Sequence, residues 1–282
     1  MKTIVSEINT DPGHGSRGRA IGQVAFLFGL TRRERLSGAQ LRRLLGDLGT
    51  SPDAARTLLA RMVRSGLLTS HRDGRTTAYA LAGSLAAGFA RVRDQAMTRP
   101  TPWPGHFHAL LHAVPEEHRA FRDALRRAAL MAGYGLLQPG VLVALTDRRA
   151  VLAELLAAAP ETSRVRAVTL GMSVTEAAEA AATAWDLPAL ATTFRAHIAA
   201  LDAAPADLGG DGLRRYVEVF QPALSDTLRE PALDPALLPP DWPGPELRRA
   251  FGRFQARHAA TTVRYLREVL DPLEPAAGRI ER

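Results

Sequence analysis

The stretch SPDAARTLLARMVRSGLLTSHRDGRTTAYAL, residues 51–81, predicts a helix that runs directly into a β-hairpin. Ser51 is a favoured N-cap residue, and Pro52 takes the first helical position, where a backbone N–H would have no helical partner. Gly66 suits the left-handed conformation that commonly ends a helix. The dipeptide Asp73-Gly74 lies between two runs that favour strand, which is typical of a hairpin with a two-residue turn.

The expected helix has one apolar face and one face rich in arginine. Its apolar residues recur at helical spacing and are Ala55, Leu58, Leu59, Met62 and Val63. Two further helix patterns precede it, around residues 21–28 and from Ser37 to Gly49. Three helices followed by a hairpin indicate a winged helix-turn-helix, a DNA-binding module whose last helix enters the major groove. The candidate DNA-binding residues, two of them near the hairpin tip, are Ser51, Arg56, Thr57, Arg61, Arg64, Arg72 and Arg75.

The charge of the chain is unevenly distributed. Residues 1–100 carry 16 Lys and Arg against 7 Asp and Glu, whereas residues 101–282 carry 20 against 22. All of the net charge of +7 therefore comes from the first third. A basic module attached to a near-neutral remainder predicts a polyanionic partner, here double-stranded DNA, for that module only. Arginine-rich codon usage would explain arginine in place of lysine, since Lys2 is the only lysine, but it does not explain this asymmetry. The alternative to a DNA-binding module is a small structural three-helix unit with solvated arginines, which the agreement of helix order, caps, hairpin and charge excess disfavours.

The overall composition bounds the class of protein. Of the 282 residues, 46% are hydrophobic and 23% are charged, which suits a folded chain of two or three domains. The absence of cysteine excludes disulfides and thiolate metal sites, and it fits a reducing compartment. The N-terminus has no apolar signal-peptide core, and the longest apolar runs are shorter than the roughly 20 residues of a membrane helix. We therefore expect a cytoplasmic protein with no membrane partner.

Three segments resemble the PaaX-type transcriptional regulators. The first is AARTLLARMVRSGLLTSHRDGRTTAYALAG, residues 54–83, which fits the family's arginine-bearing helix and its hairpin pattern, although leucine stands where the family has tryptophan after Gly66. The second is GYGLLQPGVLVAL, residues 133–145, similar to a glycine-rich turn into an apolar strand. The third is LLPPDWPGPELRRAF, residues 237–251, similar to an Asp-Trp-Pro-Gly segment leading into a helix. The segment WPGHF, residues 103–107, departs from the family pattern.

The resemblance implies a homodimeric repressor of a catabolic operon. Such a protein binds a palindromic operator and is released by a small effector, such as an aryl-acetyl or acyl-CoA thioester. The resemblance also implies a ferredoxin-like fold for the central part, where the sequence itself shows strand and helix patterns in the order βαβαβ up to residue 172. Beyond residue 172 only helix patterns follow.

We therefore expect a multidomain α+β protein that is mostly α. Its expected parts are a flexible N-terminus at 1–17, a winged helix-turn-helix DNA-binding domain at 18–98, a linker at 99–105, a ferredoxin-like α+β domain at 106–172 and a helical C-terminal domain at 173–282.

The candidate effector-binding residues come from the central and C-terminal segments: Trp103, His106, His108, Arg122, Arg126, Tyr134 and Trp242. The two arginines lie along one expected helix, either as a solvated face or as contacts for the phosphates of a coenzyme A ligand. His106, His108 and His112 share one face of a strand, but no acidic residue or cysteine has the matching spacing of a metal site. Ordinary surface or core histidines are therefore favoured, and no metal or cofactor is expected.

The motifs of the common enzyme classes are absent from the sequence. There is no P-loop, no GxGxxG after a strand, no GxSxG and no HExxH, and no nucleophile stands near an acid–base pair. We expect an effector-responsive DNA-binding regulator with no catalytic residues. The alternatives are an effector-independent, architectural DNA-binding protein and an enzyme with a basic accessory domain.

Overall fold

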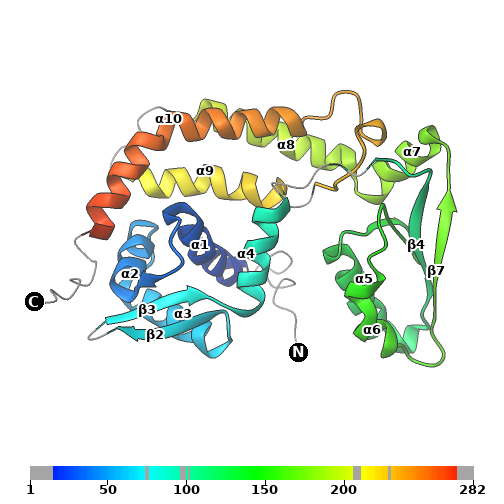
Figure 1. Cartoon of the computed structure of the whole chain (residues 1–282), viewed down its shortest axis with the longest axis horizontal. Coiled ribbons are helices and arrows are strands. Elements are labelled where there is room, and N and C mark those ends of the chain that lie inside the picture. The colour runs from blue at the N-terminus through cyan, green and yellow to red at the C-terminus, as the bar shows by residue number, and fades with distance from the viewer. Residues whose placement is uncertain are drawn as a thin grey trace, which may run out of the picture. The chain divides into compact units, whose positions relative to one another are not determined.

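The computed structural model describes residues 15–73, 76–95, 100, 102–205, 211–227 and 230–271. The chain divides into two compact units, the first comprising residues 1–97, 198–225 and 248–282 and the second residues 98–197 and 226–247. The described residues are mostly helical and form two small antiparallel sheets, one in each unit (Figure 1). This agrees with the expected mostly α, multidomain α+β class. The flexible N-terminus predicted at 1–17 lies outside the described residues except for its last three, which begin the first helix.

The first unit combines N-terminal helices and a small sheet with helical segments from far along the chain. Its helices are α1 (Gly15–Thr31), α2 (Gly38–Asp47), α3 (Pro52–Arg64), α4 (Gly83–Gln95), α9 (Gly212–Thr227) and most of α10 (Gly244–Leu270). Its strands are β1 (Leu36–Ser37), β2 (Leu68–Asp73) and β3 (Thr76–Leu81), in the order β1-β3-β2.

Side-chain caps fix where α2 and α3 begin. Ser37 and Gln40 form a capping box at α2, in which Ser37 Oγ accepts a hydrogen bond from the Gln40 backbone N–H at 3.1 Å. Ser51 Oγ accepts from the backbone N–H of Ala54 at 3.3 Å, and Pro52 is the first residue of α3. Gly66, with φ of +70°, follows the end of α3 in the left-handed region. The predicted start of α2 at Ser37 and the predicted caps of α3 are confirmed.

The hairpin differs from the prediction at Asp73, which the sequence placed in the turn. β2 and β3 pair from Leu68–Leu81 to Asp73–Thr76, so Asp73 belongs to strand β2. Gly74 and Arg75 lie outside the described residues. The short strand β1 and helix α4 were not expected, since two residues carry no periodic signal and α4 alternates apolar residues with glycine and alanine.

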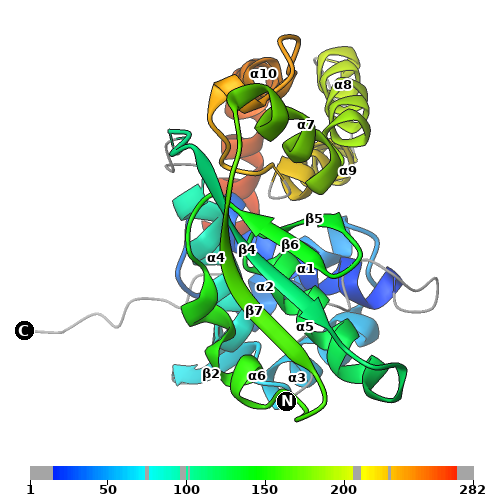
Figure 2. The same cartoon turned by 90° about the vertical axis from the view of Figure 1, so that its right-hand side faces the viewer.

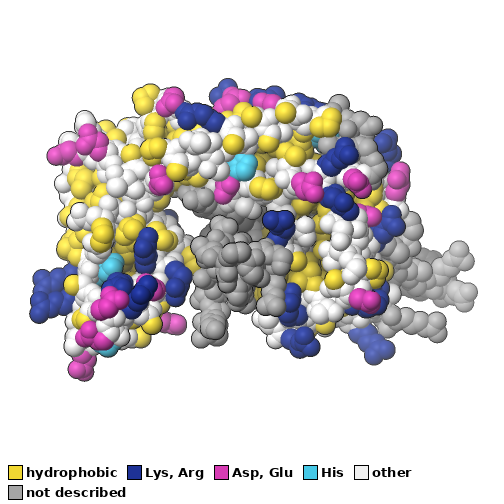
Figure 3. All heavy atoms as spheres, turned by 180° about the vertical axis from the view of Figure 1, so that it is seen from behind, with side chains coloured by type: hydrophobic (Ala, Val, Ile, Leu, Met, Phe, Trp, Pro, Cys, Tyr) yellow, Lys and Arg dark blue, Asp and Glu magenta, His cyan; other side chains and the backbone are white. Residues whose placement is uncertain are grey.

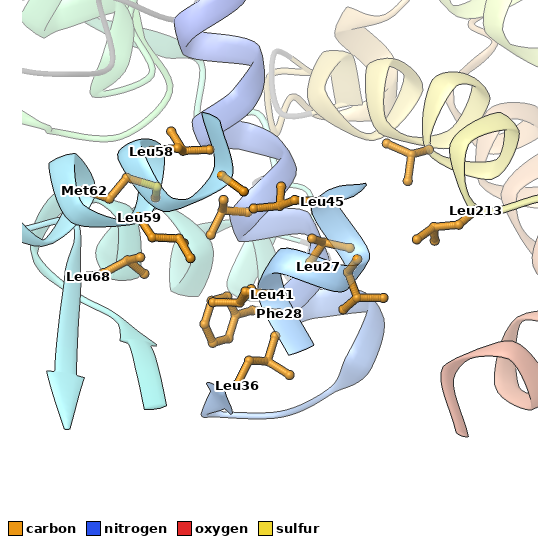
Figure 4. Packing of buried hydrophobic residues seen from close by; sticks show 14 of the residues in the cluster. Leu27, Phe28, Leu36, Leu41, Leu45, Leu58, Leu59, Met62, Leu68 and Leu213 are labelled. Carbon is orange, nitrogen blue, oxygen red and sulfur yellow. The ribbon is translucent and has the colours of Figure 1, made fainter. Parts of the chain in front are cut away.

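Leucine side chains from α1, α2, α3 and β2 build the core of the first unit. Leu27, Leu41, Leu45, Leu59 and Leu68 are at most 2% exposed, and Figure 4 shows them pointing toward one another from different elements. This arrangement uses the apolar face predicted for α3 and leaves its other face outside the core.

The second unit is built on a four-stranded antiparallel sheet. Its strands are β4 (His106–Ala113), β5 (Gly135–Gln138), β6 (Val141–Ala144) and β7 (Arg164–Gly171), in the order β5-β6-β4-β7 (Figure 2). Its helical segments are η2 (Glu116–His118), α5 (Arg119–Met131), η3 (Arg149–Leu152), α6 (Ala153–Ala157), α7 (Val174–Ala184), most of α8 (Leu187–Ala203) and η4 (Pro235–Leu237).

Both faces of this sheet are covered. Leu110, Leu142 and Tyr134 pack with residues of α5 and η3 on one face, whereas Phe107 and Val143 pack with α7 and η4 on the other. Strand alternation therefore divides β4 between two cores.

The glycine-rich segment at residues 133–145 forms one more strand than the sequence predicted. The sequence predicts a turn that enters one strand, but residues 135–138 form a strand of their own before the turn at Gly140, where φ is +82°. A Cβ on Gly135 would lie 2.8 Å from Cβ of Ala184 and 2.8 Å from the Trp185 ring, so α7 packs directly against this strand. Glycine at position 135 thus serves the approach of helix to sheet.

Within the described ranges, no helix combines the length and the apolar character that a membrane span requires.

Candidate nucleic-acid interface

Helix α3 has one buried and one exposed side. Ala55, Leu58, Leu59 and Met62 are at most 5% exposed and belong to the core of the first unit. Arg56, Thr57 and Arg64 are exposed, and Arg61 is partly buried. The basic residues predicted to contact DNA therefore stand on the side of α3 that no other described element covers as core.

Two of the candidate residues, Ser51 at the N-cap of α3 and Arg56 in its second turn, are engaged in local contacts. The Ser51 hydroxyl oxygen is engaged in capping the helix. The Arg56 guanidinium is paired with the carboxylate of Asp53, one turn earlier, and both side chains are largely exposed. An exposed pair of this kind contributes only about 0–1 kcal/mol, so it does not prevent Arg56 from exchanging its partner for a phosphate or a base.

The hairpin carries the remaining candidates. Arg72 is exposed on β2, opposite Thr77 of β3. Arg75, the second predicted arginine of the hairpin tip, lies outside the described residues. In the space-filling view of Figure 3, basic side chains stand out at the lower right of the molecule, and others stand out at its left edge.

Helix α2 carries two further exposed arginines, which were not singled out from the sequence. Arg42 and Arg43 are both exposed on this helix. A Cβ on Gly38 would lie 3.1 Å from the Arg42 guanidinium and 3.3 Å from the Tyr79 ring, so Arg42 extends beside strand β3. Arg43 pairs with Asp47 at 3.4 Å. The signal was an adjacent Arg-Arg between two buried leucines, on the helix that in helix-turn-helix proteins crosses the DNA backbone.

The structure separates the candidate effector residues onto two faces of the second sheet. Trp103 and Trp242 pack into the core on the α7 side. The Trp103 backbone N–H donates to the Asp234 carboxylate at 2.7 Å, and the Trp242 indole N–H donates to Glu230 at 2.8 Å. Both tryptophans therefore hold the segment around residues 230–242 against this core.

The other candidates lie on the α5 side or on α5 itself. Tyr134 is 2% exposed within the core, and burial raises its pKa. Arg122 donates to Glu116 at 2.8 Å, and Arg126 is exposed. The hydrogen bond from Arg122, and then its charge, lower the pKa of Glu116. These contacts are compatible with a solvated helix face.

The histidines of β4 do not gather into a metal centre. The rings of His106 and His108 are 5.2 Å apart. Both ring nitrogens of His112 are buried and have no hydrogen-bond partner among the described residues. Burial, and then the charge of Arg122, lower the pKa of His112. Across the described part of the chain, no group of three or more His, Cys, Asp or Glu residues is arranged to hold a metal ion.

Comparison with known proteins agrees with these features. Residues 27–85 match the family model described as PaaX-like protein, and residues 100–183 match that of the PaaX protein central Cas2-like domain. The chain is also similar to a solved structure, the uncharacterized protein Rv0674 from Mycobacterium tuberculosis. The identity is 27% and the TM-score 0.58, over 82% of this chain and 89% of that one. No curated protein matches the chain significantly.

The two family matches fall one in each unit and together cover about half of the chain. The fold and the matches define a multidomain α+β protein of the regulator class. The chain belongs to the PaaX-type family of transcriptional regulators.

Proposed function

We propose that this protein is a sequence-specific, DNA-binding transcriptional regulator. The observation that carries the proposal is the exposed arginine side of α3, on a capped helix whose other side is buried and which leads directly into the β2–β3 hairpin. The excess of basic residues in the first 100 positions and the family match at residues 27–85 support the same function.

In this proposal the first unit contains a winged helix-turn-helix domain within residues 18–98. Helix α3 enters the major groove, Arg56, Thr57 and Arg61 contact groove atoms, and Arg64 and Ser51 lie at its ends. Arg72 and Arg75 contact the phosphate backbone from the hairpin. Arg42 and Arg43 add backbone contacts from α2.

The second unit contains a ferredoxin-like domain within residues 106–172 in the same proposal. Support comes from the strand order β5-β6-β4-β7 and from the chain order β4, α5, β5, β6, α6, β7. Residues 99–105 are the linker, and residues 173–282 supply the helical C-terminal part.

The regulation that we propose follows the family. A homodimer represses a catabolic operon in the cytoplasm, and a small effector such as an aryl-acetyl or acyl-CoA thioester releases it. An effector that binds the DNA-incompetent conformation more tightly shifts the population away from the operator. The candidate effector contacts are the seven residues of the second unit described above, of which the exposed Arg126 and the partly buried His106 and His108 are the more accessible ones.

The test is fluorescence anisotropy of the full-length protein on the DNA upstream of its own gene. A scrambled duplex is the control, at about 0.15 M salt, because affinities for DNA depend strongly on ionic strength. The titration is repeated with phenylacetyl-CoA and with free CoA. We expect selective binding that only the thioester releases.

Other outcomes separate the alternatives. Selective binding without release keeps the regulator and rejects this effector. Equal affinity for both duplexes contradicts the sequence-specific function and favours an architectural protein. No binding to either, together with hydrolase activity toward the thioester, favours an enzyme with a basic accessory domain.

A further inference from the structure

The C-terminal end of α10 is fastened to α2 by two hydrogen bonds. The Gln40 side-chain amide donates from Nε2 to the carbonyl oxygen of Leu270 at 3.2 Å, and this glutamine is 2% exposed. The Tyr265 hydroxyl donates to the carboxylate of Asp47 at the other end of α2. Both ends of the short helix α2 are therefore held by the last two turns of α10.

The surroundings of Gln40 and Tyr265 support these two hydrogen bonds. Gln40 Oε1 accepts from the backbone N–H of Ser37 at 2.8 Å, so one amide completes the capping box of α2 and binds a terminal carbonyl of α10. Burial, and then the hydrogen bond to Asp47, hold the pKa of Tyr265 above its usual value. The hydroxyl therefore stays protonated, and able to donate, up to a higher pH than a free tyrosine.

Apolar contacts continue the same attachment. Val269 and Leu270 are 8% and 3% exposed and lie in one core with Leu41, Leu44 and the apolar side of α3. Tyr265 and Leu266 pack against the same core.

Helix α9 reaches the turn between α2 and α3. Leu213 belongs to the core, and Figure 4 shows it coming from α9 on the far side of α2. A Cβ on Gly49 would lie 3.2 Å from the Arg214 guanidinium, and Gly49 has φ of +89°. Among the described residues, Arg214 Nε is buried with no hydrogen-bond partner. This guanidinium lies where the carbonyl end of α2 places partial negative charge.

We propose that α9 and the end of α10 are a positioning element for DNA binding, with Tyr265 and Gln40 as its positioning residues. They contact no DNA, but they fix α2, and through α2 the orientation of α3 in the groove. The inference rests on the proposed DNA-binding function. It implies that the DNA-reading part of the chain is not confined to its first 100 residues.

The test compares two tyrosine variants of the full-length protein. Tyr265→Phe removes only the hydroxyl that binds Asp47. Tyr216→Phe removes the hydroxyl of a buried tyrosine on α9, which packs on Phe220 and Phe254 and, among the described residues, makes no hydrogen bond or ring contact with α2. It therefore controls for the loss of any tyrosine hydroxyl from these two helices. We expect Tyr265→Phe to weaken operator binding about tenfold, the lower range for a hydrogen bond to a charged group, and Tyr216→Phe to change it less than twofold.

Two readouts distinguish positioning from other roles. A positioning residue changes affinity for the operator but leaves affinity for a scrambled duplex and the salt slope unchanged. Amide hydrogen exchange in the absence of DNA should quicken in residues 52–64 of Tyr265→Phe and not of Tyr216→Phe. The exchange measurement needs no DNA, so it tests separately whether α10 fixes α3 through α2. If the wild type shows no selective DNA binding but exchange in α3 still changes, the proposed function fails and the positioning of α3 stands.

A second variant removes the other hydrogen bond, because the aromatic ring that remains in Tyr265→Phe still packs against the core and can hold α10 in place. Gln40→Glu keeps an acceptor for the Ser37 N–H but replaces the donor to Leu270 with an oxygen, so it should reproduce the Tyr265→Phe effects more strongly. The proposal is overturned if both variants keep wild-type exchange in α3. It is equally overturned if operator and scrambled affinities fall together with a general loss of protection, since the contacts would then serve stability alone.

Discussion

The candidate residues of the two units are arranged in different ways. In the first unit they stand on one exposed side of α3 and on the adjoining hairpin, whereas in the second they are divided between two faces of a sheet, with Tyr134 buried in a core. DNA is a long polyanion that is read by side chains protruding from one surface. A small ligand needs side chains that converge on a concave site. The geometry therefore supports the DNA-binding half of the proposed function more directly than the effector half.

Core truncations test how separate the two units are, and they have the largest expected effect. Leu59 of α3 and Leu142 of β6 are 2% and 0% exposed. Replacing either with alanine should lower the free energy of unfolding by about 2–5 kcal/mol, measured by urea denaturation. Leu59→Ala should also weaken operator binding, while Leu142→Ala should leave it within about twofold. Equal loss of operator binding in the two variants would contradict a division of labour between the units.

Removing the α3 arginine nearest the N-terminal turn has the next largest effect. Arg56→Ala should cost about 1–3 kcal/mol of operator binding and much less on a scrambled duplex, because base contacts carry the selectivity. Arg127→Ala, which removes an exposed arginine of α5 in the second unit, is the matched control. If Arg127→Ala is as harmful in the anisotropy titration, the side of α3 is not a specific interface.

The hairpin arginines test whether the first unit contacts phosphates as well as bases. Arg72→Ala and Arg75→Ala should weaken binding to all sequences by a similar factor and reduce the slope of log affinity against log salt by about one each. Titrations at three salt concentrations measure that slope. An unchanged slope for either variant removes that arginine from the phosphate contacts.

Local signals explain what could be predicted from the sequence. Ser37, Ser51 and Gly66 act on neighbours three or four residues away, so the ends of α2 and α3 were predictable. The hairpin was predicted with Asp73 in its turn, because Asp73 pairs with Thr76 and the dipeptide rule does not contain that register. Strand β5 was missed because four residues between two turns resemble a single loop.

Contacts between distant segments could not be predicted. Gln40 and Leu270 are 230 positions apart, and nothing in either segment indicates the other. The same holds for Trp103 and Asp234, which are joined across 131 positions. The candidate DNA contacts come from one helix and the hairpin that follows it, which local signals can predict, whereas an effector site depends on long-range packing of this second kind.

The smallest expected effect is the dependence of stability on pH. It involves one buried histidine in the first unit and one histidine in the second unit whose ring nitrogens are buried. His258 is 1% exposed beside Phe254, its Nε2 has no described hydrogen-bond partner, and burial followed by the charge of Arg257 lowers its pKa. Below the unfolded-state pKa of about 6.5, this histidine takes up a proton in the unfolded chain but stays neutral in the folded chain. Its contribution to the free energy of unfolding is therefore fully present above that pH and is lost as the pH decreases. His112 in the second unit has a pKa shifted in the same direction.

Thermal unfolding between pH 8 and pH 5 separates these two contributions. His258→Leu should flatten the acid-side decrease in Tm but leave the part due to His112, whereas Phe254→Leu, which removes no titrating group, should lower Tm by a similar amount at every pH. If His258→Leu keeps the wild-type slope, its imidazole is accommodated in both protonation states, and the aromatic core of α9 and α10 is more open to water than its burial indicates.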